Sequence, residues 1–247
     1  MSRTSHEPSA GAGSADSDWK GLYRVGAGAA LLMAAFIPIQ IIVFIIWPPP
    51  GTVTGWFNLY QEHPLVGLLD MDLLLIVDQV FVALIMVTLY VVLRRSRQSL
   101  MTVALTLSAL GIAAYFASTA AFEMLSLSGE YAAATTEAQR ATLLAAGQVM
   151  LSTWQGTAFS VGYVLEGIGL LLVAIVMLHS TVFGKSTART GIVLGVMSLV
   201  PPTVGTVGMF FALGSLVPLV IWDILVARRL FRLGQDVTQV SRSSLPS

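Results

Sequence analysis

Three carboxyl side chains lie within one of the most apolar stretches of the chain. In LLDMDLLLIVDQV, residues 68–80, Asp70, Asp72 and Asp78 interrupt a run that is otherwise almost entirely apolar. An ionised carboxyl group at the centre of a bilayer costs roughly 2.5 to 3.5 kcal/mol on insertion scales, so an acid inside a membrane helix normally faces other helices or a water-filled cavity. Carboxyl groups placed in this way can bind protons or cations, or act as general acids.

A second series of polar side chains follows later in the chain at intervals of three and four residues. Its members are Gln148, Ser152, Gln155, Phe159, Tyr163 and Glu166. This spacing places them along one face of a helix, with Glu166 at the deep end. A looser polar face in the preceding apolar segment carries Glu123 toward its outer side. Acidic residues from three predicted helices therefore converge.

The angular positions of the first three acids predict a central helix. At about 100° per residue, Asp70 and Asp78 point about 80° apart, whereas Asp72 lies on the far side of the helix beside Gln79. Two polar faces require neighbours on both sides. We predict an outward-facing acidic pocket with Asp78 and Glu166 as the deepest residues and the candidate catalytic groups. Its predicted ligand-binding residues are Asp70, Asp72, Asp78, Glu123, Trp154, Gln155, Tyr163 and Glu166.

No Lys or Arg occurs inside the predicted spans apart from Arg228 and Arg229, the last two residues of the final span. The acids of the pocket must then be protonated, hydrated or paired with something that binds. The alternative is that neutral carboxyl and tyrosine hydroxyl groups only hold helices together by hydrogen bonds. Asp223 is expected to differ, because it lies five residues before Arg228 near the end of the last span, where an interfacial ion pair is predicted.

The composition is that of an integral membrane protein. Of 247 residues, 55% are hydrophobic and 11% are charged, and the mean hydropathy is +0.81, whereas about a quarter of residues are charged in soluble domains. Cysteine is absent and the three histidines lie in separate segments, so neither a metal site nor a cofactor is predicted. A net charge of zero gives no reason to expect nucleic acid. The expected partners are the lipid bilayer and a small cationic or lipophilic ligand.

Six membrane crossings are predicted, since a bilayer core needs about 20 apolar residues in a helix. The last apolar run, 191–227, is too long for one span, and Pro201, Pro202, Gly205 and Gly208 supply a break within it. The predicted spans are 25–47, 65–93, 100–125, 156–178, 191–206 and 209–229.

Basic residues orient these spans. Every Lys and Arg except Arg140 lies before the first span, after the second or fourth span, or at the C-terminal end. Because basic loops stay in the cytoplasm, both termini are predicted to be cytoplasmic. The predicted fold is an all-α, six-helix transmembrane bundle spanning residues 19–234, with disordered tails at 1–18 and 235–247.

The outer connections also carry local signals. WPPPGTVTGWFNLYQEHP places aromatic residues around a proline-rich turn, which is typical of an aromatic belt with a short interfacial helix. In ATTEAQRATLLAAGQVM, Thr136 and Gln139 fit a capping box, so a short external helix is predicted to begin there and to run into the fourth span.

Several of these stretches together resemble a known family. They are GLYRVGAGAALL, DMDLLLIVDQV followed by LYVVLRR, EYAAATTEAQRATLLAAGQ, and WQGTAFSVGYVLEG. With them the chain resembles a bacterial integral-membrane family defined as domain of unknown function 4386 (DUF4386), over about residues 19–234. The resemblance implies a six-helix bundle in the bacterial cytoplasmic (inner) membrane. It implies no reaction, cofactor or catalytic residue.

Three kinds of function fit these patterns. The first is binding or transport of a proton or a small cationic or amphipathic ligand from the outer side. The second is an integral-membrane enzyme in which Asp78 or Glu166 performs acid–base chemistry on a lipophilic substrate, with Tyr163 and Trp154 steadying positive charge. The third is a structural or accessory role. The absence of an evident inverted repeat opposes transport, and the absence of a catalytic signature opposes an enzyme; binding or transport is favoured.

Overall fold

The computed structural model describes the backbone of residues 11–243 and the side chains of residues 19–235, and within this part the regular structure is entirely helical. Five helical segments are long and apolar enough to cross a membrane. They are Trp19–Ile46, Pro64–Leu93, Gln98–Ala133, Glu137–His179 and Gly205–Gln235. The chain is therefore a helical membrane protein, as its composition predicts.

Six helices pack in a ring, each against the next. In ring order they are α1 (Gly11–Ile46), α4 (Leu74–Leu93), α5 (Gln98–Phe116), α8 (Thr157–His179), α9 (Lys185–Met197) and α10 (Gly205–Ser243). The helix α10 returns to pack on α1, which closes the ring, and α4 also touches α8 across it. A continuous apolar core joins these helices, including Met33, Leu89, Met101, Val173 and Leu230.

The helices α5 and α8 approach each other closely because both carry glycine at the contact. A Cβ atom on Gly162 would lie 2.8 Å from the carbonyl oxygen of Gly111, and a Cβ atom on Gly111 would lie 2.8 Å from that of Gly162. Small residues allow such close backbone packing in membrane bundles, where dispersion contacts drive helix association.

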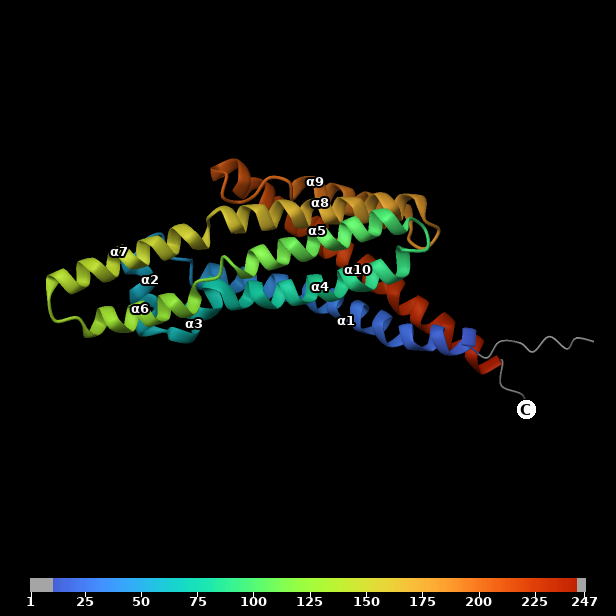
Figure 1. The fold of residues 1–247 in the computed structure, drawn as a ribbon, viewed down its shortest axis with the longest axis horizontal. Helices are drawn as coiled ribbons and strands as arrows, with labels where there is room; N and C mark the ends of the chain where they lie inside the picture. The colour runs from blue at the N-terminus through green and yellow to red at the C-terminus, as the bar shows by residue number, and fades with distance from the viewer. Residues whose placement is uncertain (1–10, 244–247) are drawn as a thin grey trace, which may run out of the picture.

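Four short elements form a separate layer at one end of the molecule, which we call the outer cap (Figure 1). They are α2 (Val53–Glu62), α3 (Pro64–Leu68), α6 (Ala121–Ala133) and α7 (Glu137–Trp154). The core of the outer cap contains Trp56, Phe57, Tyr60, Met71 and Met124. The short helix predicted in the proline-rich connection exists as α2, but three of its aromatic residues are buried in this core rather than arranged as a membrane belt.

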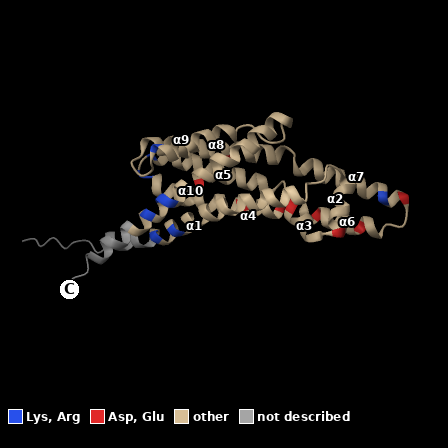
Figure 2. Ribbon diagram, turned by 180° about the vertical axis from the view of Figure 1, so that it is seen from behind, with Lys and Arg blue, Asp and Glu red and all other residues tan. Residues whose placement is uncertain are grey.

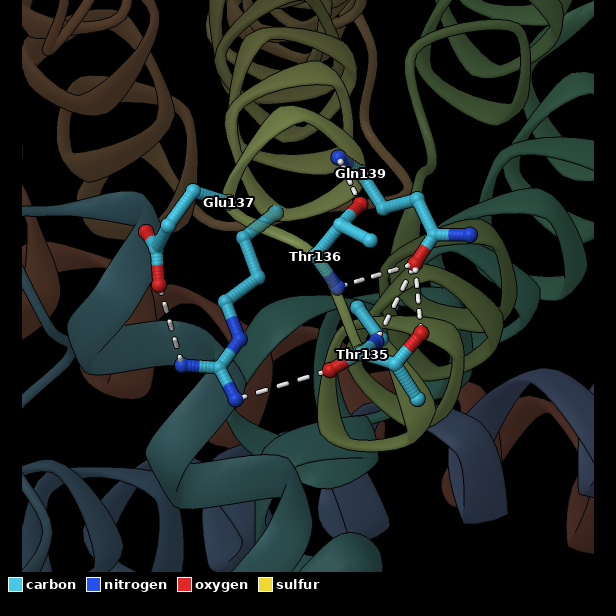
Figure 3. A network of polar contacts seen from close by, with 6 residues as sticks. Thr135, Thr136, Glu137 and Gln139 are labelled. Atoms are coloured by element: carbon cyan, nitrogen blue, oxygen red, sulfur yellow. Dashed lines mark hydrogen bonds and ion pairs between the residues drawn. The ribbon is translucent and has the colours of Figure 1, made fainter.

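Side-chain caps start two helices of the outer cap. The predicted capping box is confirmed: the Thr136 hydroxyl accepts a hydrogen bond from the Gln139 amide at 3.2 Å, and the Gln139 side-chain oxygen accepts one from the Thr136 amide at 3.2 Å (Figure 3). Thr52 caps α2 by accepting from the Gly55 amide at 3.1 Å. These bonds satisfy amide groups that the first helical turn leaves without partners.

Two predicted spans are parts of longer, interrupted helices. The segment Gln98–Ala133 breaks between α5 and α6, and the segment Glu137–His179 breaks between α7 and α8 at Gln155 and Gly156. The helix predicted to begin at Thr136 is therefore present as α7, but it does not run unbroken into the fourth span; its external location stays a prediction. Each break leaves one helix in the ring and the other in the outer cap.

The last apolar run breaks earlier than predicted. The helix α9 ends at Met197 and α10 begins at Gly205, whereas the predicted boundary lies between 206 and 209. Gly205 has a φ of +61°, a left-handed conformation that glycine adopts without strain, so it can end the turn. With 13 residues, α9 spans only about 20 Å, and it is not among the five long apolar segments. The count of six crossings stays a prediction.

The predicted tails lie partly outside the described residues. Of the two ranges, 11–18 belong to α1 and 235–243 belong to α10, while 1–10 and 244–247 are not described.

Charge is separated along the long axis of the molecule (Figure 2). Lys and Arg gather at the end where α1 begins and α4, α8 and α10 leave the ring, and most Asp and Glu lie in the other half, toward the outer cap. At the basic end, the Arg94 guanidinium lies over the Trp19 ring, 5.3 Å from its centroid. We call these the basic end and the cap end.

Candidate functional site

Asp78 lies on α4, and its side chain points toward α1. Its side chain is 9% exposed, and its Oδ2 oxygen accepts a short hydrogen bond from the Gln40 amide group. Gln40 also lies 3.4 Å from the Leu74 carbonyl oxygen, to which it donates. The other oxygen of Asp78, Oδ1, is buried and has no hydrogen-bond partner. One amide therefore holds the carboxyl group in place without neutralising it.

Glu166 lies on α8, and its side chain points across the ring toward α4. The Gln79 side chain donates to its Oε2 oxygen at 3.4 Å, which links α4 to α8. The Oε1 oxygens of Glu166 and of Gln79 are both buried without a partner. Asp78 and Gln79 are neighbours in sequence but point to different helices, which confirms the prediction that α4 has polar faces on two sides.

Tyr115 brings a hydroxyl group from α5 toward these two acids. The residue is 6% exposed, its hydroxyl has no hydrogen-bond partner, and it is close enough to Asp72, Asp78 and Glu166 to interact with each electrostatically. We call Gln40, Asp78, Gln79, Tyr115 and Glu166 the central polar cluster. It draws on α1, α4, α5 and α8.

Asp223 lies deeper in the same interior, and its predicted ion pair with Arg228 is wrong. The residue is 0% exposed and both carboxyl oxygens lack a partner. Five residues correspond to about 140° around a helix, so the two side chains leave α10 on different faces. Asp223 interacts electrostatically with Asp78 instead. The five-residue spacing between Asp223 and Arg228 is the sequence signal that indicates different faces of the helix for the two side chains.

Asp72 has a structural role that the sequence did not reveal. Its Oδ2 oxygen accepts from the amides of Ala120 and Ala121, each at 2.6 Å, and its Oδ1 oxygen accepts from the Trp154 indole at 2.9 Å. A carboxylate at the start of α6 is favoured by the helix dipole. Asp72 and Trp154 are therefore brought together, but as a clamp that joins the outer cap to the ring.

A π-helical turn, η1 (Leu69–Leu73), carries Asp70 and Asp72. Such a turn inserts one residue relative to an α-helix, so the predicted angles between Asp70 and the later acids do not apply. Asp70 is 2% exposed, and neither of its carboxyl oxygens has a partner. It is thus a second buried acid in this turn, and unlike Asp72 it has no hydrogen-bond donor beside it.

Tyr60 belongs to the core of the outer cap and lies near Asp70 and Asp72. Its hydroxyl donates to the sulfur of Met71 at 3.4 Å. Burial, with the negative charges of Asp72, Asp70 and Glu123 added, raises the pKa of the Tyr60 hydroxyl above its usual value.

Two predicted residues are exposed, and Tyr163 lies at the edge of the interior, close enough to Glu166 to interact with it electrostatically. Glu123 is exposed in the first turn of α6, and Gln155 is exposed at the break after α7. Tyr163 is half-buried one turn before Glu166, where its ring stacks on Phe159 at 6.4 Å between centroids. The break at Gln155 and Gly156 interrupts the predicted polar face, which is why its outer members do not join Glu166.

Two of the open grooves in the described part lie away from the buried acids. One, of about 510 Å³, lies between α9 and α10, and the other, of about 480 Å³, lies between α6 and α7 and includes Glu123. No three acidic or histidine side chains of the described residues are placed to hold a metal ion.

Comparison with family models assigns residues 62–234 to "Domain of unknown function (DUF4386)". The chain belongs to the DUF4386 family. The match begins at the end of α2, so α1 and its Gln40 lie outside it, whereas the sequence resemblance was expected from residue 19. Comparisons with curated proteins and with solved structures found no significant match.

Proposed function

We propose that this DUF4386 protein binds and releases protons at carboxyl groups inside the helix ring, as part of transport across the bacterial cytoplasmic membrane. The supporting observation is an excess of hydrogen-bond acceptors over donors. Among described side chains, seven of the nine buried polar atoms without partners are carboxyl or amide oxygens. A carboxylate can only accept, whereas a protonated carboxyl group gains an O–H donor. Protonation of the carboxyl groups would therefore supply the hydrogen-bond donors that these buried oxygens lack.

The packing favours a proton over a larger cation. One carboxyl oxygen of Asp78 and one of Glu166 are fully buried, and neither of the two grooves opens onto them. An organic cation would need a cavity of its own size around the charge. A proton needs only the oxygen atom and a hydrogen-bonded route to it.

The buried acids follow one another through the interior. Asp70 lies in the π-helical turn beside the outer cap, and Asp78 lies eight residues, or about 12 Å, further along the same helix. Asp223, which interacts with Asp78, lies five residues before the arginines at the basic end. In the proposal, protons enter from the cap end and reach Asp223 through the central polar cluster.

The proposed topology has six crossings, with the basic end and both termini in the cytoplasm. The chain from α9 to α10 runs back along α8: Gly191 packs near Ala174, and the hydroxyl groups of Thr203 and Ser160 share a hydrogen bond of 2.8 Å. Since Ser160 lies in the first turn of α8, the turn before α10 lies level with the outer end of that helix. This supports two crossings in the last run.

Infrared difference spectroscopy tests the proton-binding groups. Protein in lipid membranes is shifted between low and high external pH, and the band of protonated carboxyl groups is recorded. We expect the pH-dependent part of the band to shrink in Asp78→Asn, Glu166→Gln and Asp223→Asn. Glu123→Gln, which changes an exposed acid, is the control and should affect this buried-carboxyl signal least. An unchanged band in all three interior variants would refute the proposal.

A further inference from the structure

The groove between α9 and α10 combines an apolar floor with one charged end. It has a volume of about 510 Å³ and is lined by Arg189, Thr190, Val193, Met197, Gly214, Val217, Pro218 and Ile221. Val193, Val217 and Ile221 are each 46% exposed or more, so the apolar walls are open to the surroundings of the ring. Gly214 leaves room beside Met197, because a Cβ atom there would lie 2.9 Å from its Cε atom.

The length of the groove matches one leaflet of a bilayer. From Arg189 to Met197 the helix α9 rises about 12 Å, and half of a bilayer core is about 15 Å. The helix α9 begins at the basic end (Figure 2), and Arg189 and Met197 are its fifth and last residues. The groove therefore runs from the cytoplasmic boundary of the proposed topology toward the middle of the membrane.

Arg189 has no acidic partner within residues 19–235, whose side chains the structure describes. Its side chain is exposed, and among the described residues the ion pair present joins Arg140 and Glu137 in the outer cap. Thr190 already donates its hydroxyl proton to the Ser186 carbonyl oxygen at 3.0 Å, which leaves the guanidinium as the main donor at this end. A guanidinium group matches a phosphate in geometry as well as in charge.

We propose that this groove binds an anionic phospholipid of the cytoplasmic leaflet, with its phosphate on Arg189 and one acyl chain along Val193, Met197 and Val217. Basic pockets between membrane helices on the cytoplasmic side suit anionic headgroups. The inference rests on the proposed topology but on none of the buried carboxyl groups. An experiment that rules out the proton site would therefore not rule out the lipid site, and the reverse also holds.

Native mass spectrometry of the full chain tests the lipid site. Protein is equilibrated with mixed vesicles of phosphatidylglycerol and phosphatidylcholine, and the ratio of the two retained lipids is measured. We expect phosphatidylglycerol to be favoured in the wild type and the ratio to fall about fivefold in Arg189→Gln, the factor that corresponds to about 1 kcal/mol for one basic residue at the membrane surface. Arg189→Lys, which keeps the charge, should retain most of the preference.

Two further variants separate the groove from general surface charge. Lys185→Gln removes an exposed charge in the first turn of the same helix, outside the groove, and should leave the ratio nearly unchanged. Val217→Trp fills the groove and should lower retention of both lipids. Equal ratios in wild type and Arg189→Gln, an equal loss in Lys185→Gln, or full displacement of the lipid by inorganic phosphate would each overturn the proposal.

Discussion

Asp72 and Asp78 show how two acids of one apolar stretch acquire different roles. Asp72 accepts three hydrogen bonds from amide and indole donors, so both of its oxygens are satisfied where it lies. Asp78 accepts a single side-chain bond and keeps one oxygen without a partner. Both are buried, but only Asp78 has an unsatisfied oxygen that a proton could use. The difference lies in their partners rather than in their position in the sequence.

Replacement of Asp72 should weaken the junction between the outer cap and the ring. In Asp72→Ala, the amides of Ala120 and Ala121 and the Trp154 indole lose their acceptor, and hydrogen bonds to a charged group are worth about 1.5 to 3 kcal/mol each in favourable cases. We expect a loss of about 2 kcal/mol or more in stability, measured by thermal unfolding in detergent. Glu123→Ala, an exposed acid nearby, is the control. Equal unfolding temperatures for both variants would show that the clamp contributes nothing.

Tyr60 should make the protein sensitive to alkaline pH. The pKa of its hydroxyl is raised in the folded state, whereas an unfolded tyrosine ionises near about 10. Because the folded state then holds the proton more tightly, stability from this group is present below pH 10 and is lost as the pH rises further. We expect the denaturation midpoint to fall between pH 9 and about 11, and to fall less in Tyr60→Phe. A fall of the same size in both proteins would exclude Tyr60 as its source.

At the scale of the helices, the sequence predicts which segments are helical and in what order they follow, but it does not locate the points at which long helices are broken. Hydropathy locates the spans because apolar length is a strong signal, and the Thr136 capping box locates the start of α7 because its chemistry is local. The break at Gln155 and Gly156 has no comparable signal, since three- and four-residue periodicity continues across it. That is why Gln155 was expected in the pocket and is found outside it.

The three- and four-residue spacing of polar residues also does not predict which side chains meet across the ring. Asp78 and Glu166 were expected in the interior because acids on apolar helices face their neighbours. Gln40 and Asp223 were missed as members, although a polar residue in the apolar run of α1 is a visible signal. Their roles depend on which helices are adjacent, and this order is set by tertiary packing.

Glycine substitutions test the close contact of α5 with α8. Alanine at Gly162 places a Cβ atom 2.8 Å from a backbone carbonyl oxygen, so we expect destabilisation of about 1 to 3 kcal/mol from overpacking. Alanine at Gly129 in α6 meets nothing within 4 Å and should stabilise by up to about 1 kcal/mol through helix propensity. Thermal unfolding of the two variants should therefore shift in opposite directions. A stabilised Gly162→Ala protein would contradict the described contact.

At the scale of the whole molecule, separated charge predicts the orientation in the membrane. The chain contains no cysteine, so single cysteines can report the side on which a residue lies. A membrane-impermeant maleimide should label Ala138→Cys and Val204→Cys in intact cells, and should label Ser96→Cys only after lysis, because a cluster of three arginines surrounds only the last site. All three positions are exposed. Labelling of Val204→Cys only after lysis would reduce the crossings to five.

The most direct test of the central claim is proton entry into proteoliposomes that contain a pH-sensitive dye. After an external acid pulse, the wild type should acidify the interior faster than liposomes without protein. Asp78→Asn and Glu166→Gln should abolish this difference, since they preserve the shape of the side chain but cannot bind the proton. Glu123→Gln should behave as the wild type does. Equal rates for wild-type protein, both interior variants and empty liposomes would contradict proton passage through the ring.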